Sequence, residues 1–384
     1  MCYKLLVDSL YHATYNYVKI NGKGGIFMRK TYLDNIRWIT VVLVVIYHVI
    51  YMFNGIETAG VLGPFADVQP QDAFQYMVYP WFMLLLFVVS GMCARFSLNN
   101  HTEREFLRAR TRKLLVPSTI GLLVFQWILG YYNMCISGAF DTMSTGVPRP
   151  ILYLIMAVSG TGVLWYIQML WLFSVLLVLL RKVEKDRFYR LCEKTNGVIL
   201  LLLTIAIYGA AQILNTPLIV VYRFGIYGLG FFIGYFCLSH DAVIDRLENY
   251  WLPLVIAAVA LGIAFLVVYW GAPYAEHVVL DTPLCNAFAW IAVLAVLVFM
   301  RRWGNFENAF STFMNRESWG LYVFHYLPLA VSAYYLRVCQ PELAPLLCYL
   351  LVTVAAFAGA FVLNSVISRI PVLRWCVLGL KKCK

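Results

Sequence analysis

Apolar stretches long enough to cross a bilayer recur along this chain, and the first of them carries two ionisable side chains. Tyr32 to Phe53 reads YLDNIRWITVVLVVIYHVIYMF, with Arg37 near its start and His48 deep inside it. About 20 apolar residues in helical conformation span the hydrocarbon core of a membrane. Ionisable groups at that depth are costly and indicate a functional site. The stretch therefore predicts a transmembrane helix with a functional role.

The composition places the chain among polytopic membrane proteins. Of its 384 residues, 62% are hydrophobic and only 13% are charged, whereas a soluble globular domain has roughly 25% charged residues. The net charge of +11 does not indicate nucleic-acid binding, because the lysines and arginines lie in loops between apolar segments, where they act as topology signals. We expect an all-α integral membrane protein whose main partner is the lipid bilayer.

Ten segments have the length and apolar character of a membrane span. They cover residues 35–54, 74–97, 114–133, 162–180, 197–214, 218–237, 251–270, 284–300, 318–336 and 343–365. The apolar run at 150–160 is too short to span and predicts an interfacial or re-entrant piece. A bundle of about ten transmembrane helices is therefore the expected fold.

The charges predict the orientation of that bundle. With a cytoplasmic N-terminus, the inner side receives the basic clusters at 104–113 and 181–194 and a basic tail ending KKCK, and only Arg149 and Arg337 lie outside. This one-sided placement follows the positive-inside rule and predicts that both termini are cytoplasmic. The expected regions are an N-terminal tail or extension at 1–27, a membrane domain at 28–375 and a basic cytoplasmic tail at 376–384.

Arg37 and His48 share one face of the first helix, because eleven steps of about 100° return to within about 20° of the start. Asp34 lies near the same face. The helical rise puts Arg37 and His48 roughly 16 Å apart, too far for a hydrogen bond. This spacing suits a long ligand with a charged end, and a neutral histidine is the usual general base or acyl acceptor near pH 7. The alternative is a histidine bonded to a neighbouring helix and an arginine that reaches lipid phosphate.

Basic residues crowd the entry to the third segment. Arg108, Arg110, Arg112 and Lys113 lie in EFLRARTRKLLVP, and arginine pairs bidentately with phosphate. They predict an anion site, or they anchor the topology and bind anionic lipid. In the second segment, the Ser90-Gly91 pair of FVVSGM indicates either close helix packing or a ligand pocket.

Further candidates lie later in the chain. Trp165 is expected at the outer interface, and Gln168 is expected to hydrogen-bond between helices. The stretch SWGLYVFH contains Tyr322 and a second intramembrane histidine, His325. Nucleophile-elbow, HExxH and P-loop patterns are absent from the sequence, and the spacing of the ten cysteines fits neither a zinc site nor a disulfide framework. We expect no metal.

These motifs, taken in order, resemble acyltransferase family 3, a family of integral membrane O-acyltransferases of sugars and envelope polysaccharides. The matching features are Leu33-Asp34 with Arg37 and His48, FVVSGM, Phe106 with Arg110 and Lys113 before Pro117, and SWGLYVFH; the resemblance covers residues 28–375. The sequence departs from the family pattern at Lys113, where arginine is usual, and at Val163, where a histidine often precedes the Leu-Trp-Phe motif.

The resemblance implies transfer of an acyl group, usually acetyl from cytoplasmic acetyl-CoA or another acyl-CoA, to a hydroxyl of a carbohydrate, lipid-linked glycan or other envelope acceptor. It also implies a multi-pass protein of a bacterial-type cell membrane. The expected catalytic residues are His48, Arg37 and His325, the donor contacts are Arg108, Arg110, Arg112, Lys113 and Ser90, and the substrate contacts are Trp165, Tyr322 and Asp34. Two alternatives remain: a transporter or flippase of a lipid-linked glycan, and a structural or regulatory membrane protein.

Overall fold

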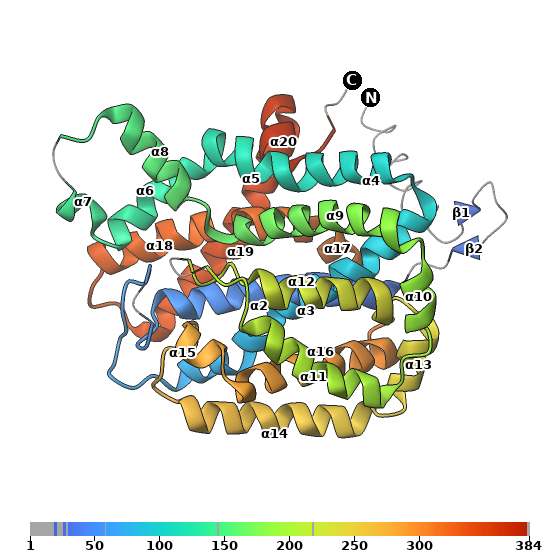
Figure 1. Cartoon of the computed structure of the whole chain (residues 1–384). Coiled ribbons are helices and arrows are strands. Elements are labelled where there is room, and N and C mark those ends of the chain that lie inside the picture. The colour runs from blue at the N-terminus through green and yellow to red at the C-terminus, as the bar shows by residue number, and fades with distance from the viewer. Residues whose placement is uncertain are drawn as a thin grey trace.

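The computed structural model describes residues 19–20, 26–27, 30–57, 59–143, 146–216 and 219–381. Helices make up most of this part of the chain (Figure 1). Two short strands, β1 (Lys19–Ile20) and β2 (Ile26–Phe27), pair antiparallel. The rest of the expected tail at 1–27, and residues 382–384 of the expected basic tail, lie outside the described residues.

The helices of the first half follow each other closely. Several are joined only by a short 3₁₀-helix or π-helix, which carries the label η. They are α2 (Thr31–Met52), η1 (Pro70–Asp72), α3 (Ala73–Asn100), α4 (Glu103–Arg110), η2 (Thr111–Leu115), α5 (Val116–Gly121), η3 (Leu122–Gln126), α6 (Trp127–Ile136), α7 (Ala139–Thr142), α8 (Arg149–Ser159), η4 (Gly162–Leu164), α9 (Trp165–Glu184) and α10 (Arg187–Cys192).

The second half of the described chain adds eleven further helical elements. They are α11 (Gly197–Ala211), α12 (Phe224–Ile233), η5 (Gly234–Leu238), α13 (Asp241–Glu248), α14 (Trp251–Tyr269), α15 (His277–Leu280), α16 (Pro283–Trp303), α17 (Ala309–Phe324), α18 (Tyr326–Cys339), α19 (Pro345–Arg369) and α20 (Pro371–Leu378), where η5 continues α12. The predicted boundary between the membrane domain and the basic tail, at residue 375, falls inside α20. The last residues of that helix are buried.

Seven helical stretches of the described chain are long and apolar enough to cross a membrane, which makes this a multi-pass membrane protein. They are Thr31–Met52, Pro70–Asn100, Glu103–Ile136, Gly162–Glu184, Trp251–Tyr269, Pro283–Trp303 and Pro345–Arg369. An eighth results if Phe224–Leu238 and Asp241–Glu248, which meet at a 95° bend, form one broken span. The all-helical fold is thus confirmed, whereas ten spans and the orientation of the termini stay predictions.

Some of the predicted segments are shorter or broken in the structure, among them the following two. The segment at 197–214 is the 15-residue helix α11. The segment at 318–336 is divided at His325 into α17 and α18. Pro328 explains the division, because proline has no N–H to donate to the carbonyl of Phe324 one turn earlier. The break places the ring of His325 where it can bond to backbone carbonyls of its own helix.

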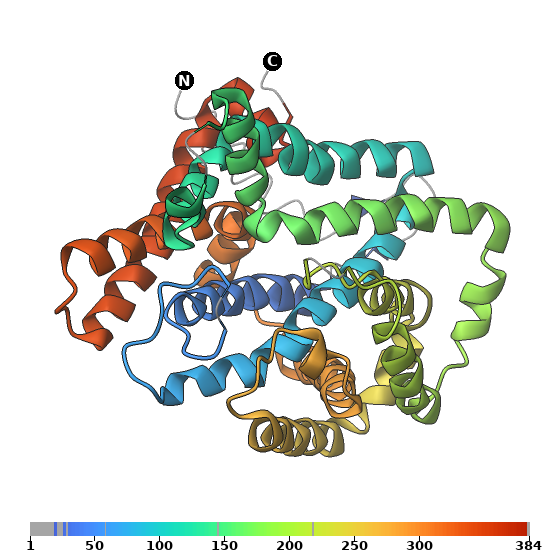
Figure 2. The same ribbon diagram turned by 60° about the vertical axis from the view of Figure 1, so that its left-hand side comes forward.

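Helices α3 and α16 form the centre of the bundle. In the apolar stretch of each of these two helices, 72% of the residues are buried inside the protein, against 17% in α14 and 22% in α19. Helix α3 packs against α2, α12, α14 and α16. Figures 1 and 2 both place α14 and α4 on opposite edges of the bundle. Aliphatic side chains on α14 and α19, such as Ile263 and Leu350, are exposed, as expected of helices that face lipid.

Glycines allow α3 to approach the α12–η5 helix closely. A Cβ added at Gly91 would lie 2.0 Å from the carbonyl oxygen of Phe231, and one at Gly234 would lie 2.1 Å from that of Val88. Only glycine therefore fits at either position. The packing interpretation of the Ser90-Gly91 pair is correct for Gly91, and it leaves Ser90 facing a different neighbour.

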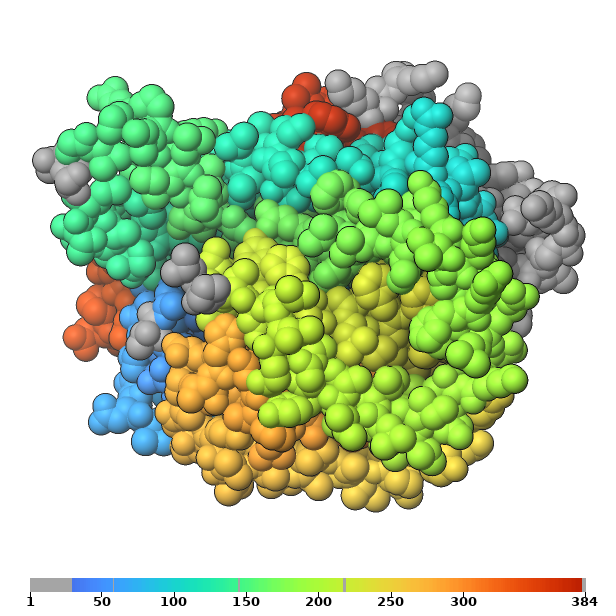
Figure 3. Space-filling view, viewed as in Figure 1, coloured from blue at the N-terminus to red at the C-terminus, as the bar shows by residue number. Residues whose placement is uncertain are grey.

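The loops of the bundle gather at two ends of contrasting charge. At the basic end, ion pairs join helix ends and loops that are distant in sequence: Lys30 with Asp241, Arg95 with Asp186 at 2.6 Å, and Arg301 with Asp245 at 2.9 Å. The described residues of the segments 53–69, 137–161, 212–223, 270–282 and 340–344 lie toward the opposite end (Figure 1). On the face in Figure 3, the part of the chain from α6 to α8 protrudes at that opposite end.

Candidate functional site

A cavity of about 400 Å³, the basic cavity, opens among α2, α3, α4, α9 and α17. Arg37, Arg110 and Lys113 contribute positive charge to its lining, and Ser90 and Tyr166 contribute hydroxyl groups. Phe106 and Arg110, spaced i and i+4, share one side of α4, and Lys113 follows in the wider turn η2. The guanidinium of Arg110 lies 5.1 Å from the ring centre of Phe106. This arrangement suits an anion with several phosphate groups.

A second cavity of about 530 Å³, the aromatic cavity, lies toward the opposite end of the bundle. His48 lines it together with a set of aromatic side chains and two carboxylates. The aromatic residues are Tyr47, Tyr51, Tyr79, Phe82, Trp165, Tyr227, Tyr322 and Tyr326, and the carboxylates belong to Glu57 and Glu276. Aromatic faces with a few polar groups are typical of small-molecule sites.

Tyr322 lines both cavities and forms part of the wall between them. Its hydroxyl donates a hydrogen bond to the carbonyl of Val163, which also lines the aromatic cavity. Beside it, the hydroxyl of Tyr166 lies 2.8 Å from Ser90 Oγ. Tyr322 therefore stands between the two cavities and is held there by its hydrogen bond to Val163.

His48 and His325 contact each other at this level of the bundle. Nδ1 of His48 lies 3.1 Å from Nε2 of His325. Nδ1 of the fully buried His325 lies 3.0 Å from the carbonyl oxygens of both Leu321 and Tyr322. Carbonyls only accept, so this nitrogen carries the proton and Nε2 of neutral His325 is an acceptor.

The tautomer of His325 determines that of His48. Nδ1 of His48 has to donate to Nε2 of His325, which leaves the lone pair of the neutral ring on Nε2 of His48. His48 also lines the aromatic cavity. The pair therefore presents an oriented basic nitrogen at a cavity.

The structure brings together most, though not all, of the predicted site residues. Arg37, Arg110, Lys113 and Ser90 line the basic cavity, Trp165 and His48 line the aromatic cavity, and Tyr322 lines both. Among the described residues, Arg108 and Arg112 stand outside both linings, as does Asp34. Asp34 lies 3.3 Å from Arg37 in an ion pair, which links it to the basic cavity through that arginine. Gln168 bonds to Ser118 and Tyr222, which confirms its predicted role between helices.

Sequence reasoning missed Glu57, which follows the first span. Its side chain is only 6% exposed, and one carboxylate oxygen accepts a hydrogen bond of 2.9 Å from the backbone N–H of Ala275. Burial raises the pKa of Glu57, and the nearby Glu276 adds to this, whereas the Ala275 hydrogen bond opposes it. The available signal was a carboxylate just beyond a span in a loop without lysine or arginine.

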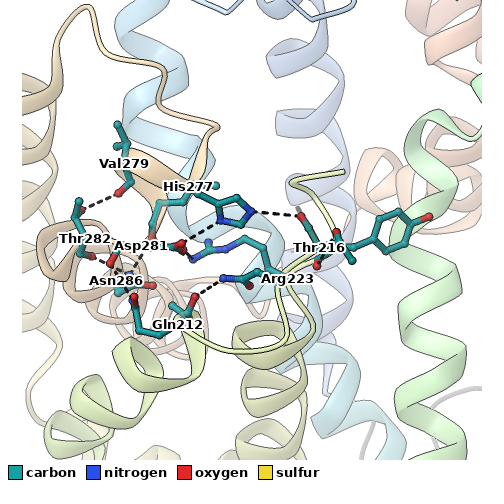
Figure 4. A network of polar contacts seen from close by, with 12 residues as sticks. Gln212, Thr216, Arg223, His277, Val279, Asp281, Thr282 and Asn286 are labelled. Atoms are coloured by element: carbon teal, nitrogen blue, oxygen red, sulfur yellow. Dashed lines mark hydrogen bonds and ion pairs between the residues drawn. The ribbon is translucent and has the colours of Figure 1, made fainter. Parts of the chain in front are cut away.

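Sequence reasoning also missed a polar network around Arg223 (Figure 4). The guanidinium, buried at the start of α12, donates to the carbonyl of Leu280 at 3.1 Å and to the carboxylate of Asp281 at 3.3 Å. Asp281 also contacts His277 at 3.0 Å, and Gln212 donates to its backbone carbonyl at 2.9 Å. The network fastens the loop at 270–282, which carries Glu276, to the segment at 219–223; both line the aromatic cavity.

Within the described residues, there is no group of three or more histidine, cysteine or acidic side chains that could hold a metal ion.

Comparison with known proteins identifies the family. A family model described as an acyltransferase domain matches residues 30–365, which include both cavities and the His48–His325 pair. The chain matches no curated protein and no solved structure. Because the match covers nearly the whole chain, this multi-pass membrane protein belongs to acyltransferase family 3.

Proposed function

We propose that this acyltransferase takes an acyl-CoA, with acetyl as the acyl group, in the basic cavity and transfers the acyl group to a hydroxyl of an acceptor in the aromatic cavity. The observation that carries this proposal is the placement of Arg37 and His48. They lie on one helix, about 16 Å apart by helical rise, and line different cavities. A long donor with phosphates at one end and a thioester at the other matches that separation.

Arg37, Arg110 and Lys113 hold the phosphates of the donor in this proposal, because charge-assisted hydrogen bonds to phosphate are strong and geometrically specific. The pantetheine arm then runs between α2 and α17 toward the wall formed by Tyr322. Arg108 and Arg112 are not assigned to the donor, since they lie outside the lining of the basic cavity.

His48 acts as the general base. Nε2 of His48 takes the proton of the acceptor hydroxyl while the oxygen attacks the thioester carbonyl carbon. The carbon–sulfur bond breaks, and the proton passes from His48 to the sulfur of the leaving CoA. His325 is a positioning residue, because it holds the ring of His48 and its tautomer without contacting the acceptor.

The proposed acceptor is a carbohydrate or another hydroxyl compound of the cell envelope, and the proposed location is a bacterial-type cell membrane with the basic end in the cytoplasm. The one-sided distribution of lysine and arginine supports that orientation. The aromatic lining supports an acceptor with a ring or another apolar face that stacks on tyrosine and tryptophan.

The test is incorporation of labelled acetyl from acetyl-CoA into acceptor by the purified protein in nanodiscs. His48→Ala abolishes incorporation, whereas His101→Ala, a change at an exposed histidine outside both cavities, leaves it unchanged. A protein that moves a glycan but incorporates no label is a transporter, and active His48→Ala refutes the assigned base. Label that stays on the protein without acceptor shows transfer through an acyl-histidine instead of direct transfer.

A further inference from the structure

We propose that the acceptor carries a cationic amine or quaternary ammonium group close to its hydroxyl, and that Glu57 binds this cation in the aromatic cavity. The inference rests on the proposed function, since it assigns the acceptor class of the same cavity. Its evidence is the charge of the cavity, the state of the Glu57 carboxylate and the arrangement of the aromatic rings.

The two cavities have opposite charge. Glu57 and Glu276 are acidic members of the aromatic lining, and none of the described residues in that lining is lysine or arginine. The basic cavity instead contains Arg37, Arg110 and Lys113. Complementary potentials decide which charged partner enters a site and exclude the opposite sign. An anionic donor is therefore directed to one cavity, and the other favours a neutral or positive molecule.

Of a neutral and a positive molecule, Glu57 favours the positive one as the occupant of the aromatic cavity. Glu57 lines the cavity, and only 6% of the residue is exposed. One carboxylate oxygen is bound by the N–H of Ala275, and the other has no hydrogen-bond partner among the described residues. Burying an ionised carboxylate is unfavourable unless it is paired. A cation in the cavity supplies the missing partner.

The aromatic rings provide the rest of a cation site. The ring of Tyr47 stacks on Tyr51 with centres 5.7 Å apart and on Tyr79 with centres 5.5 Å apart. All three rings line the same cavity as Glu57. Tyrosine faces attract ammonium groups, and clusters of aromatic rings bind quaternary ammonium compounds. Rings and carboxylate together therefore suit an amino alcohol or an amino sugar better than a uronic acid or a phosphorylated sugar.

Two small alcohols of equal shape test the charge preference. Choline and 3,3-dimethylbutan-1-ol differ only in the positive charge, and neither has an amine that could be acylated. Their binding to the purified protein in nanodiscs is measured by calorimetry or tryptophan fluorescence. We expect choline to bind about tenfold or more tightly than the uncharged alcohol. Glu57→Gln removes this difference, whereas Asp67→Asn, at an exposed acid of the same loop outside the lining, preserves it.

Equal affinity for the two alcohols, failure of choline to bind, or an undiminished preference in Glu57→Gln overturns the inference. The result is independent of catalysis, because the same measurement on His48→Ala reports binding in a protein without the proposed base. A choline preference without acyl transfer refutes the proposed function and leaves the cation site standing. Acyl transfer without a preference for choline refutes the cation site and leaves the proposed function standing.

Discussion

Nδ1 of His48 lies 3.1 Å from Nε2 of His325, although 277 positions separate the two residues in the chain. The contact joins the first membrane helix to the break between α17 and α18. It also connects two carbonyl groups of α17, through two imidazole rings, to a basic nitrogen at the aromatic cavity. A positioned histidine of this kind needs a defined partner on its other nitrogen, and the fold supplies it.

Substitution of His325 separates positioning from direct catalysis. His325→Gln keeps an acceptor oxygen near the position of the ring Nε2, whereas His325→Leu has none. We expect His325→Leu to lower kcat about 100-fold with little change in donor KM, and His325→Gln to retain substantially more activity. Steady-state kinetics of both variants provide the measurement. Equal losses in the two variants contradict the positioning role.

Some of the basic residues that precede α5 line the basic cavity, and others lie outside it. Arg110→Gln and Lys113→Gln each raise the KM for acyl-CoA about tenfold, because each removes a charge-assisted hydrogen bond to phosphate. Arg108→Gln is the matched control, since it removes the same charge from the same helix outside the basic cavity. A rise in donor KM for Arg108→Gln equal to that for Arg110→Gln would show a general effect of charge.

Tyr322→Phe tests the wall between the cavities. The change deletes the hydrogen bond from Tyr322 to the carbonyl of Val163 and keeps the ring. Loss of a hydrogen bond of about 1 kcal/mol raises the population of an open wall about fivefold. We expect hydrolysis of acetyl-CoA without acceptor to rise by a similar factor, because water reaches the thioester. Release of free CoA measures it, with Tyr208→Phe, outside both cavities, as control.

The ion pair between Arg223 and Asp281 is expected to stabilise the end of the bundle opposite the basic end. Asp281→Asn leaves the buried guanidinium of Arg223 without its carboxylate and lowers stability by about 2 kcal/mol, a value reduced for the partial exposure of Asp281. The apparent melting temperature in detergent measures the loss. Arg302→Met, which removes the exposed ion pair to Glu248, serves as control and changes stability by less than about 1 kcal/mol. Equal losses would contradict a special role for the buried pair.

The raised pKa of Glu57 predicts a pH dependence of choline binding. Only the ionised carboxylate attracts the cation, so affinity is weak below the pKa of Glu57 in the folded protein and increases as the pH rises through it. Choline keeps its charge throughout. Glu276 is the titratable group that raises the pKa of Glu57 further. The charge of Glu57 in turn acts on the neighbouring phenols of Tyr51, Tyr76, Tyr79 and Tyr274. Glu57→Gln removes the dependence, and an unchanged pH profile in that variant assigns it to another group.

The sequence predicted the arrangement along individual helices well. Helical geometry alone put Arg37 and His48 on one face and too far apart to touch, and the structure places them in different cavities. This relation depends on a local period, which a sequence contains in full. The family resemblance named Phe106, Arg110 and Lys113 together, and all three line the basic cavity.

Relations between helices were beyond such reasoning. The contact of His48 with His325 depends on which helix lies beside α2, and hydrophobic periodicity does not specify a neighbour. Arg108 and Arg112 were grouped with Arg110 by proximity in the chain, although they lie outside the cavity. Glu57 and Arg223 gained their roles from loops that meet only in the folded chain.

The wall at Tyr322 has a consequence for the electrical insulation of the membrane. Two water-accessible cavities that reach toward each other from opposite ends form a path for protons unless something divides them. Each elementary charge that crosses a potential of 100 mV releases about 2.3 kcal/mol. In the proposed reaction, the hydrogen-bonded tyrosine between the cavities lets the acyl group pass while it limits the passage of ions. The proposed enzyme would then preserve an electrochemical gradient across its membrane.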